Sequence, residues 1–324
     1  MKKLLLIFTA ISLASCSILP EKNASDTRKK EMDDALASVD VPTIEKTLYD
    51  SGQAALASGD SFKAEYYFEQ LNKKDPKNDL YKYKYAETLR RRGACAQAIE
   101  LYSDVLKDKP NDMNSTEGKA LCLVSLGDFQ KAGPLLTDII HKDSTRWKSI
   151  NAAGLIFAVN KKFKEANQYL DLAAEVSGRA PAVLNNQGLV RALVGNYDDA
   201  IKILQEASTK STENPGEKRQ IDLNLAMVYG IAKKMDKAEE TAKPWLTTPQ
   251  LYNNMGIYAE LSKDSDLART YLNKALMGTS VYYDKAWDNL EKLNGTNNNG
   301  TVSSSSPAAK TTTTSKTVKK PSSN

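Results

Sequence analysis

Seven alanines recur at one phase of a repeating unit along this chain. They are Ala64, Ala98, Ala132, Ala166, Ala200, Ala238 and Ala268. The first five are spaced by 34 residues, the next gap is 38 and the last is 30, so the two deviations cancel. A fixed period of this length is typical of a solenoid, because each unit must stack on its neighbours to bury its apolar face. The chain is therefore predicted to fold as a stack of similar units.

Other positions of the unit share this period. If the first unit is taken as 45–78, its eighth position is Gly52 and its twenty-fourth is Phe68. Glycine returns at the eighth position in three later units, at Gly154, Gly188 and Gly256. Because glycine inside a helix costs about 1 kcal/mol relative to alanine, its repetition at one phase predicts close helix–helix contact. A second set, predicted to form turns with positive φ, comprises Gly59, Gly93, Gly127 and Gly195.

The segment from Gly59 to Phe68 resembles the turn and second helix of a tetratricopeptide (TPR) unit, and the likeness extends over 45–282. The resemblance implies an all-α, right-handed superhelix of about seven helix pairs. The stretch Ser280–Asn294 has apolar residues near helical spacing, which predicts a single capping helix. We expect residues 45–294 to form this solenoid and its concave surface to bind other proteins.

The N-terminus predicts export and a lipid anchor. Residues 4–14 form an apolar run, shorter than the roughly 20 residues of a transmembrane helix, which fits a signal peptide at 1–15. Leu13-Ala14-Ser15 followed by Cys16 resembles a bacterial lipobox, which implies a lipidated Cys16; the alternative is an ordinary secretory signal with a chance cysteine. Ser17 stands where aspartate retains lipoproteins in the inner membrane of Gram-negative bacteria. By this rule for lipoproteins, the serine at this position implies that the protein is anchored at the periplasmic face of the outer membrane.

The two ends carry the excess positive charge. The full chain has 45 basic and 40 acidic residues, a net charge of +5. Residues 16–44 are polar and are predicted to be a lipidated tether, and residues 295–324 are a Ser/Thr/Lys tail that we expect to be disordered. The tail holds four lysines and no acid. The folded part is therefore near neutral, and no nucleic-acid partner is predicted.

The sequence holds no recognisable catalytic or metal-binding set. His141 is the single histidine, whereas zinc sites take three or four protein ligands, and no GxxxxGK[ST] phosphate loop occurs. We predict no metal, no cofactor and no enzyme activity; a carboxylate-based enzyme is the least favoured alternative. Cys95 and Cys122 fall in adjacent units, which leaves open either a disulfide or two separately buried thiols.

Asparagines on the first helices of the later units are the predicted binding residues. They occupy the sixth position at Asn186, Asn224 and Asn254, and the fifth position at Asn151, Asn185 and Asn253. Each amide offers two donors and an acceptor, so a row of them can bind an extended peptide backbone. The alternative is that they cap helices or bond to a neighbouring loop. Apolar residues at other positions of the first helices, including Leu189, Met227 and Ile231, are predicted to line an apolar groove. If the assigned position in the repeat is off by one residue, they lie in the core instead.

Units five to seven are similar to the TadD family. The likeness rests on residues 184–189 (LNNQGL), on 195–201 (GNYDDAI) and, after a four-residue insertion, on 219–230 (RQIDLNLAMVYG). Members of that family are outer-membrane TPR lipoproteins of Flp (Tad) pilus machines, thought to help a secretin assemble or localise. The resemblance implies partners among secretin or pilus-machine subunits. The alternative function is a lipoprotein adaptor for enzymes of cell-wall synthesis or hydrolysis.

Overall fold

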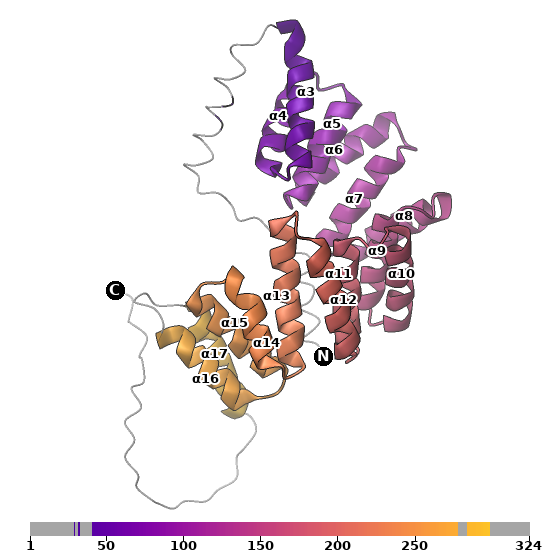
Figure 1. Cartoon of the computed structure of the whole chain (residues 1–324). Helices are drawn as coiled ribbons and strands as arrows, with labels where there is room; N and C mark the ends of the chain where they lie inside the picture. The colour runs from indigo at the N-terminus through magenta and orange to yellow at the C-terminus, as the bar shows by residue number, and fades with distance from the viewer. Residues whose placement is uncertain (1–28, 30–31, 33–40, 278–283, 299–324) are drawn as a thin grey trace, which may run out of the picture.

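The computed structural model describes residues 29, 32, 41–277 and 284–298. The predicted signal peptide, Cys16 and residues 299–324 of the predicted tail lie outside these residues. Two predicted bounds were wrong: residues 295–298 of the predicted tail belong to the last helix, and residues 41–44 of the predicted tether belong to the first long helix. Every element in the described part of the chain is helical, and no β-strand occurs there (Figure 1). The predicted all-α fold is confirmed.

The helices follow one another with short turns between them. They are α3 (Val41–Ala57), α4 (Ser61–Lys74), α5 (Asp79–Arg91), α6 (Cys95–Asp108), α7 (Met113–Ser125), α8 (Phe129–Lys142), α9 (Trp147–Val159), α10 (Phe163–Val176), α11 (Pro181–Leu193), α12 (Tyr197–Lys210), α13 (Pro215–Ile231), α14 (Met235–Ala242), the 3-10 helix η1 (Lys243–Trp245), α15 (Thr248–Leu261), α16 (Ser265–Met277) and α17 (Asp284–Asn298).

These helices form seven successive hairpins, from α3/α4 to α15/α16, and α17 packs on the last hairpin as the predicted cap. Each hairpin is one unit of the stack. Several helices begin at an acidic capping residue: Asp60, Asp112 and Asp128 each accept a hydrogen bond from the backbone N–H three residues further on. Such a bond satisfies one of the unpaired donors of a helix N-terminus.

Small residues let the two helices of a hairpin touch, as predicted. A Cβ atom added to Gly188 would lie 2.7 Å from Cγ of Leu204, and one added to Gly256 would lie 2.7 Å from Cγ of Leu272. Carbon atoms pack at about 3.5–4 Å, so a side chain at either position would collide with the second helix. The seven alanines of the repeat are all 0% exposed. The period therefore reports the contact between the two helices of each hairpin.

The turn inside each hairpin has one residue with positive φ at the same position of the unit. Four are the predicted glycines, Gly59, Gly93, Gly127 and Gly195. The other three are lysines: Lys161 at φ 60°, Lys233 at 61° and Lys263 at 67°. A side chain makes this conformation unfavourable. The packing of the hairpin therefore imposes the turn even where the sequence does not favour it.

The sixth unit departs from the others. The four-residue insertion lengthens the start of α13, and α14 has only eight residues before η1 replaces its second half. Trp245 in η1 donates from Nε1 to Oδ2 of Asp222 at 2.9 Å. The same buried carboxylate pairs with Lys218 at 3.1 Å and accepts a hydrogen bond from the Ser208 hydroxyl. This network joins α12, α13 and η1 where a full second helix is missing.

Candidate functional site

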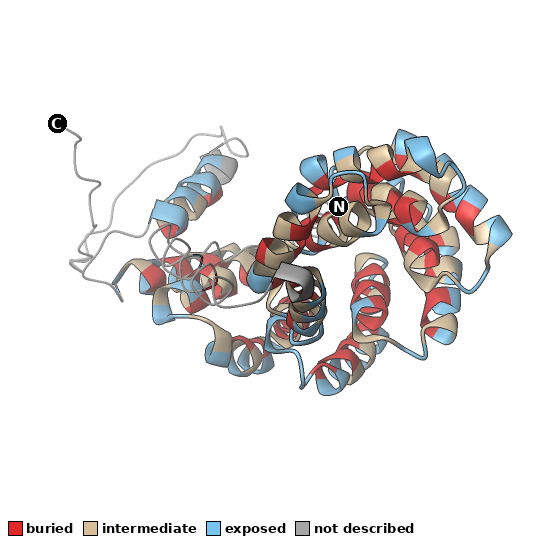
Figure 2. Ribbon diagram, turned by 90° about the horizontal axis from the view of Figure 1, so that it is seen from above, coloured by how far each residue is buried: buried red, intermediate tan, exposed pale blue. Residues whose placement is uncertain are grey.

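The first helices of the units lie on the inner side of the stack. Neighbouring first helices contact one another, as α7 does with α9 and α13 with α15, whereas no comparable contact joins neighbouring second helices in the described part of the chain. Helices on the inside of a curve lie closer together than those on the outside. Seen from above, the hairpins follow a curved path (Figure 2). The concave surface is therefore formed by α5, α7, α9, α11, α13, α15 and α17.

The predicted asparagines pair across the boundaries between units. Nδ2 of Asn186 donates to Oδ1 of Asn151 at 3.1 Å. Nδ2 of Asn224 donates to Oδ1 of Asn185 at 2.8 Å. In both pairs the fifth position of one unit accepts from the sixth position of the next. These hydrogen bonds tie α9 to α11 and α11 to α13, so the asparagines hold neighbouring first helices together.

A third pair extends this pattern into the cap. Nδ2 of Asn289 in α17 donates to Oδ1 of Asn253 in α15 at 2.9 Å. Asn289 was not among the predicted residues, because the capping helix was not aligned with the repeat. Its spacing of 36 residues from Asn253, close to one unit, is the signal that would have found it. The cap therefore continues the inner layer of helices as an eighth first helix.

The pairs leave part of each amide unused. Asn224 is 0% exposed, and its Oδ1 accepts from Gln220 at 3.3 Å, so it lies in the core between helices. Asn185 and Asn186 are 8% and 9% exposed. No hydrogen bond within the described residues engages Nδ2 of Asn151, Nδ2 of Asn185 or Oδ1 of Asn186, and none of these atoms is sealed from solvent. Donors and acceptors for a ligand therefore remain at this surface.

Asn254 differs from the other sixth-position residues. Its Oδ1 accepts from Nδ2 of Asn253, its neighbour in the same helix, at 3.5 Å. Burial raises the pKa of Tyr258, and the side chain of Asn254 acts against this shift. Asn254 is half-buried and forms no pair with a neighbouring unit among the described residues. The series of asparagine pairs is thus broken at this position.

Half of the apolar residues predicted for the same surface lie in the core. Leu189, Met227 and Ile231 are buried in the main hydrophobic cluster around α11–α15. Ala158 and Ala192 are buried as well. Leu155, Leu193 and Ile257 are half-buried. For the fully buried residues, the alternative that they belong to the core is correct. Only the half-buried side chains remain for the predicted apolar groove.

The N-terminal half of the concave surface carries a charged network. Nε and Nη2 of Arg90 donate to the two carboxylate oxygens of Glu87 at 3.0 and 2.9 Å, and the Tyr102 hydroxyl donates to the same carboxylate. Burial by itself raises the pKa of Glu87, but the bonds and the charge of Arg90 outweigh it and hold the pKa below its ordinary value. Burial and Glu87 together raise the pKa of Tyr102. Glu87 is therefore ionised and Tyr102 protonated at neutral pH.

A second carboxylate forms contacts across the boundary between the third and fourth units. The buried Glu117 accepts from the Ser149 hydroxyl at 2.8 Å and lies 3.4 Å from Nη1 of Arg146. Glu117 occupies the fifth position of its unit, the same position as Asn151 and Asn185. The fifth position thus accepts a hydrogen bond from the next unit whether it is an amide or a carboxylate.

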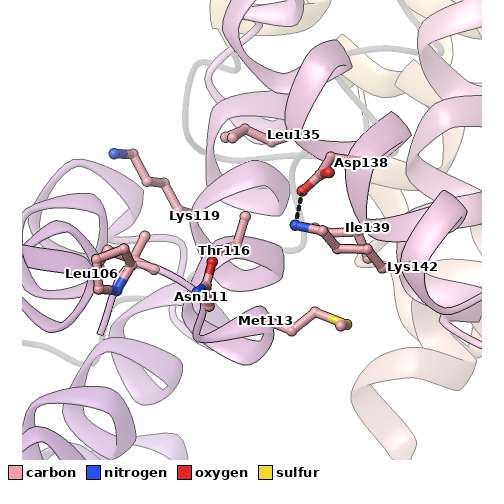
Figure 3. Close-up of a pocket in the computed structure, with 10 residues that line it drawn as sticks. Leu106, Asn111, Met113, Thr116, Lys119, Leu135, Asp138, Ile139 and Lys142 are labelled. Carbon is pink, nitrogen blue, oxygen red and sulfur yellow. Dashed lines mark hydrogen bonds and ion pairs between the residues drawn. The ribbon is translucent and has the colours of Figure 1, made fainter. Parts of the chain in front are cut away.

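A pocket of about 250 Å³ lies between α6, α7 and α8 (Figure 3). Leu106, Pro110 and Ile139 contribute apolar atoms to it. Lys142 pairs with Asp138 at 2.8 Å on one side, and Lys119 lies on the opposite side (Figure 3). The pocket belongs to the second and third units, whereas the asparagine pairs begin at α9, so the two features are separate.

Metal-binding groups, membrane-spanning helices and cysteines were sought among the described residues. They contain no group of three or more His, Cys, Asp or Glu side chains placed to hold a metal ion. None of their helices combines the length and apolar character needed to cross a bilayer. Cys95 and Cys122 are both buried and reduced, and they share one hydrophobic cluster.

Comparison with known proteins identifies the repeat. Residues 49–112 and 86–146 match the family model described as tetratricopeptide repeat. Over residues 49–146 the chain is thus similar to the tetratricopeptide repeat. TPR proteins bind protein partners, and the all-helical stack of hairpins agrees with that class. No significant match was found among curated proteins.

Two solved structures share the fold of this chain. A TPR protein from Parabacteroides merdae is 17% identical, with a TM-score of 0.51, and the match covers 78% of this chain and 99% of that one. A human IFIT1 dimer with m7Gppp-AAAA is 16% identical, with a TM-score of 0.53, over 72% of this chain and 59% of that one. A third structure, the Thermus thermophilus TPR protein TTC0263, is 19% identical with a TM-score of 0.47, over 61% of this chain and 100% of that one. At these identities the likeness to the first two concerns the fold alone.

Proposed function

We propose that this protein is a membrane-anchored scaffold that binds an extended segment of a partner protein along its concave surface. The observation that carries the proposal is the row of inter-unit asparagine pairs with unused amide groups. Nδ2 of Asn151 and Asn185 supplies donors, and Oδ1 of Asn186 supplies an acceptor. An extended backbone presents alternating carbonyl and N–H groups that match such a row, whatever its side chains are.

The finer proposal is a role in Flp/Tad-type pilus assembly, in the manner of the TadD family, with a secretin or another pilus-machine subunit as the partner. The lipobox resemblance at Cys16 and the insertion at the start of α13 support it. Cys16 would carry the acyl chains that hold the TPR stack at the periplasmic face of the outer membrane. More than one chain is needed for stable anchoring. An adaptor for cell-wall enzymes is the alternative, and the genes beside this one discriminate: secretin and pilus ATPase genes favour the first role, and murein enzyme genes the second.

The binding surface is tested by changing the unused donors while keeping the inter-unit bonds. In the variant Asn151→Asp with Asn185→Asp, each carboxylate still accepts from Asn186 or Asn224, but the free Nδ2 donors are gone. Binding to peptides that tile the candidate secretin and pilus subunits is measured by fluorescence anisotropy. We expect affinity to fall at least about tenfold, because a lost hydrogen bond with an unpaired partner costs about 1–3 kcal/mol.

The matched control is Asn160→Asp with Asn294→Asp. It adds the same two charges at exposed asparagines outside the inter-unit pairs. The control is expected to bind as the wild type does. Equal affinity in the wild type and the Asn151/Asn185 variant, with both folded by circular dichroism, would reject the asparagine row as the binding surface.

The anchor is tested by Cys16→Ala and membrane fractionation, together with metabolic labelling by a radioactive fatty acid. We expect the label to be lost and the protein to leave the outer-membrane fraction. A variant that stays wholly in that fraction would show that Cys16 does not anchor the chain.

A further inference from the structure

Two cysteines from neighbouring units lie together inside the stack. Cys95 is the first residue of α6 in the second unit, and Cys122 lies in α7 of the third. They are 3% and 0% exposed, and they share one buried cluster with Leu89 and Tyr102. The two thiols are the only sulfur-containing side chains among the described residues of this cluster, which lies between the second and third units.

The surroundings of the two thiols differ. The thiols of Cys95 and Cys122 lie in one buried cluster where α6 packs on α7, and each thiol affects the pKa of the other. The interaction with Cys122 is the largest of several effects that lower the pKa of Cys95 to about 7; Ser125 and the charge of Arg90 act in the same direction, and burial opposes them. The interaction with Cys95 and burial raise the pKa of Cys122. Cys95 is therefore the thiol prepared to react, with Cys122 beside it.

We propose that Cys95 and Cys122 are a disulfide-forming pair that covalently joins the second and third TPR units. The oxidant is another disulfide, either a small molecule or a thiol–disulfide oxidoreductase. The Cys95 thiolate attacks one sulfur of that disulfide, whose bond breaks and releases one thiol. The Cys122 sulfur then attacks Cys95 in the mixed disulfide and releases the second thiol. The protein loses two protons and two electrons, and the oxidant becomes two thiols.

The cross-link would act on the charged end of the concave surface. Tyr102 lies in the same cluster as the two cysteines and donates to Glu87, whose carboxylate also holds Arg90. Closing the 26-residue segment between the cysteines restricts the unfolded chain and raises the folding equilibrium constant by about two to three orders of magnitude. Oxidation would thus fix the α6–α7 interface on which this network depends. The inference does not rest on the proposed function.

The experiment uses the full chain carrying Cys16→Ser, so that only these two cysteines remain. The protein is unfolded in urea and refolded in oxidised glutathione, because burial would slow the reaction of the folded state. Intact mass and non-reducing peptide mapping then report the product. We expect the loss of two hydrogens, a peptide linked through Cys95 and Cys122, and a higher urea midpoint that falls again after reduction.

The single variants Cys95→Ser and Cys122→Ser are the controls. Each retains one thiol, so each is expected to give a glutathione adduct or a free thiol, with no oxidised gain in urea midpoint. If the two-cysteine protein refolds to native helicity but gives only glutathione adducts or free thiols, the proposal is overturned. A linked peptide with an unchanged or lower urea midpoint would overturn the claim that the bond fits the folded interface.

Discussion

The contact between Gly188 and Leu204 allows the packing inside a hairpin to be tested with numbers. In Gly188→Ala the new Cβ atom would lie 2.7 Å from Cγ of Leu204 and 3.2 Å from the backbone oxygen of Ala200. The first distance is about 0.8 Å shorter than the closest comfortable carbon–carbon contact. The Ala200 oxygen belongs to the helix backbone, so it cannot rotate away.

Two opposing effects set the size of the change. Overpacking of a well-filled interior costs about 1–3 kcal/mol, and the fixed oxygen places this site near the top of that range. Alanine returns about 1 kcal/mol relative to glycine inside a helix. We therefore expect Gly188→Ala to lower the free energy of unfolding by about 2 kcal/mol. The control is Gly216→Ala in α13, where the only contact within 4 Å is Oδ1 of Asn214 at 3.6 Å; it should be neutral or stabilising by up to about 1 kcal/mol.

A double-mutant cycle separates this collision from any general effect of alanine. Leu204→Ala alone should cost about 2–5 kcal/mol, because Leu204 is completely buried. With both changes the pair becomes two alanines, which are the residues that the sixth unit has at these two positions, Ala226 and Ala242. The double variant should then be more stable than the sum of the single effects predicts, by about 1–3 kcal/mol.

The assay is urea unfolding followed by circular dichroism, with hydrogen-exchange mass spectrometry to locate the change in α11 and α12. Local readout matters because a stack of units can lose one part before the rest unfolds. Additive effects in the cycle, or equal stability of Gly188→Ala and Gly216→Ala, would refute the reasoning that close approach requires glycine here.

Three further changes test other contacts by the same unfolding measurement. Lys233→Gly removes a side chain from a residue with positive φ and should stabilise the protein by about 1 kcal/mol; a loss of stability would contradict the assigned turn strain. Glu87→Gln leaves the charge of Arg90 without its partner and should cost about 3 kcal/mol at pH 7. Because the folded pKa of Glu87 is lowered, wild-type stability from this contact is lost as the pH falls below its ordinary value of 4.5, and the variant should lack that loss. Trp245→Phe keeps an aromatic ring but removes the donor to Asp222, and it should cost about 1–3 kcal/mol; unchanged exchange protection in α13 would count against this role.

The recurrent packing was predictable because it depends on single residues at a fixed phase. An alanine or glycine at a helix crossing is required in every unit, so the requirement appears in the sequence as a period. The same logic located the turns, but only where glycine occupies them. Lys161, Lys233 and Lys263 adopt the same backbone without any local preference for it, because the hairpin packing around them decides.

The asparagine pairs were only partly predictable, because each depends on the register between two helices. The sequence placed Asn151, Asn185, Asn186 and Asn224 on first helices, and the prediction treated the fifth and sixth positions as two separate rows. The structure joins the fifth position of one unit to the sixth position of the next. Aligning the units by their period compares residues at the same position of each unit. It cannot reveal a hydrogen bond between residues at different positions of two units. For the same reason the role of Asn289 was missed.

The sixth unit shows how a local defect in the repeat is offset by its neighbours. Its shortened α14 and its alanine at the twenty-fourth position remove apolar contact that other units have. In a stack that is stabilised by nearest-neighbour contacts, such a loss would weaken everything beyond it, including α17. The network around Asp222, with donors from Ser208, Lys218 and Trp245, connects the preceding unit to η1 across this gap. The asparagine pair between α15 and α17 can therefore continue the concave surface of the earlier units, because the sixth unit transmits their alignment despite its missing half-helix.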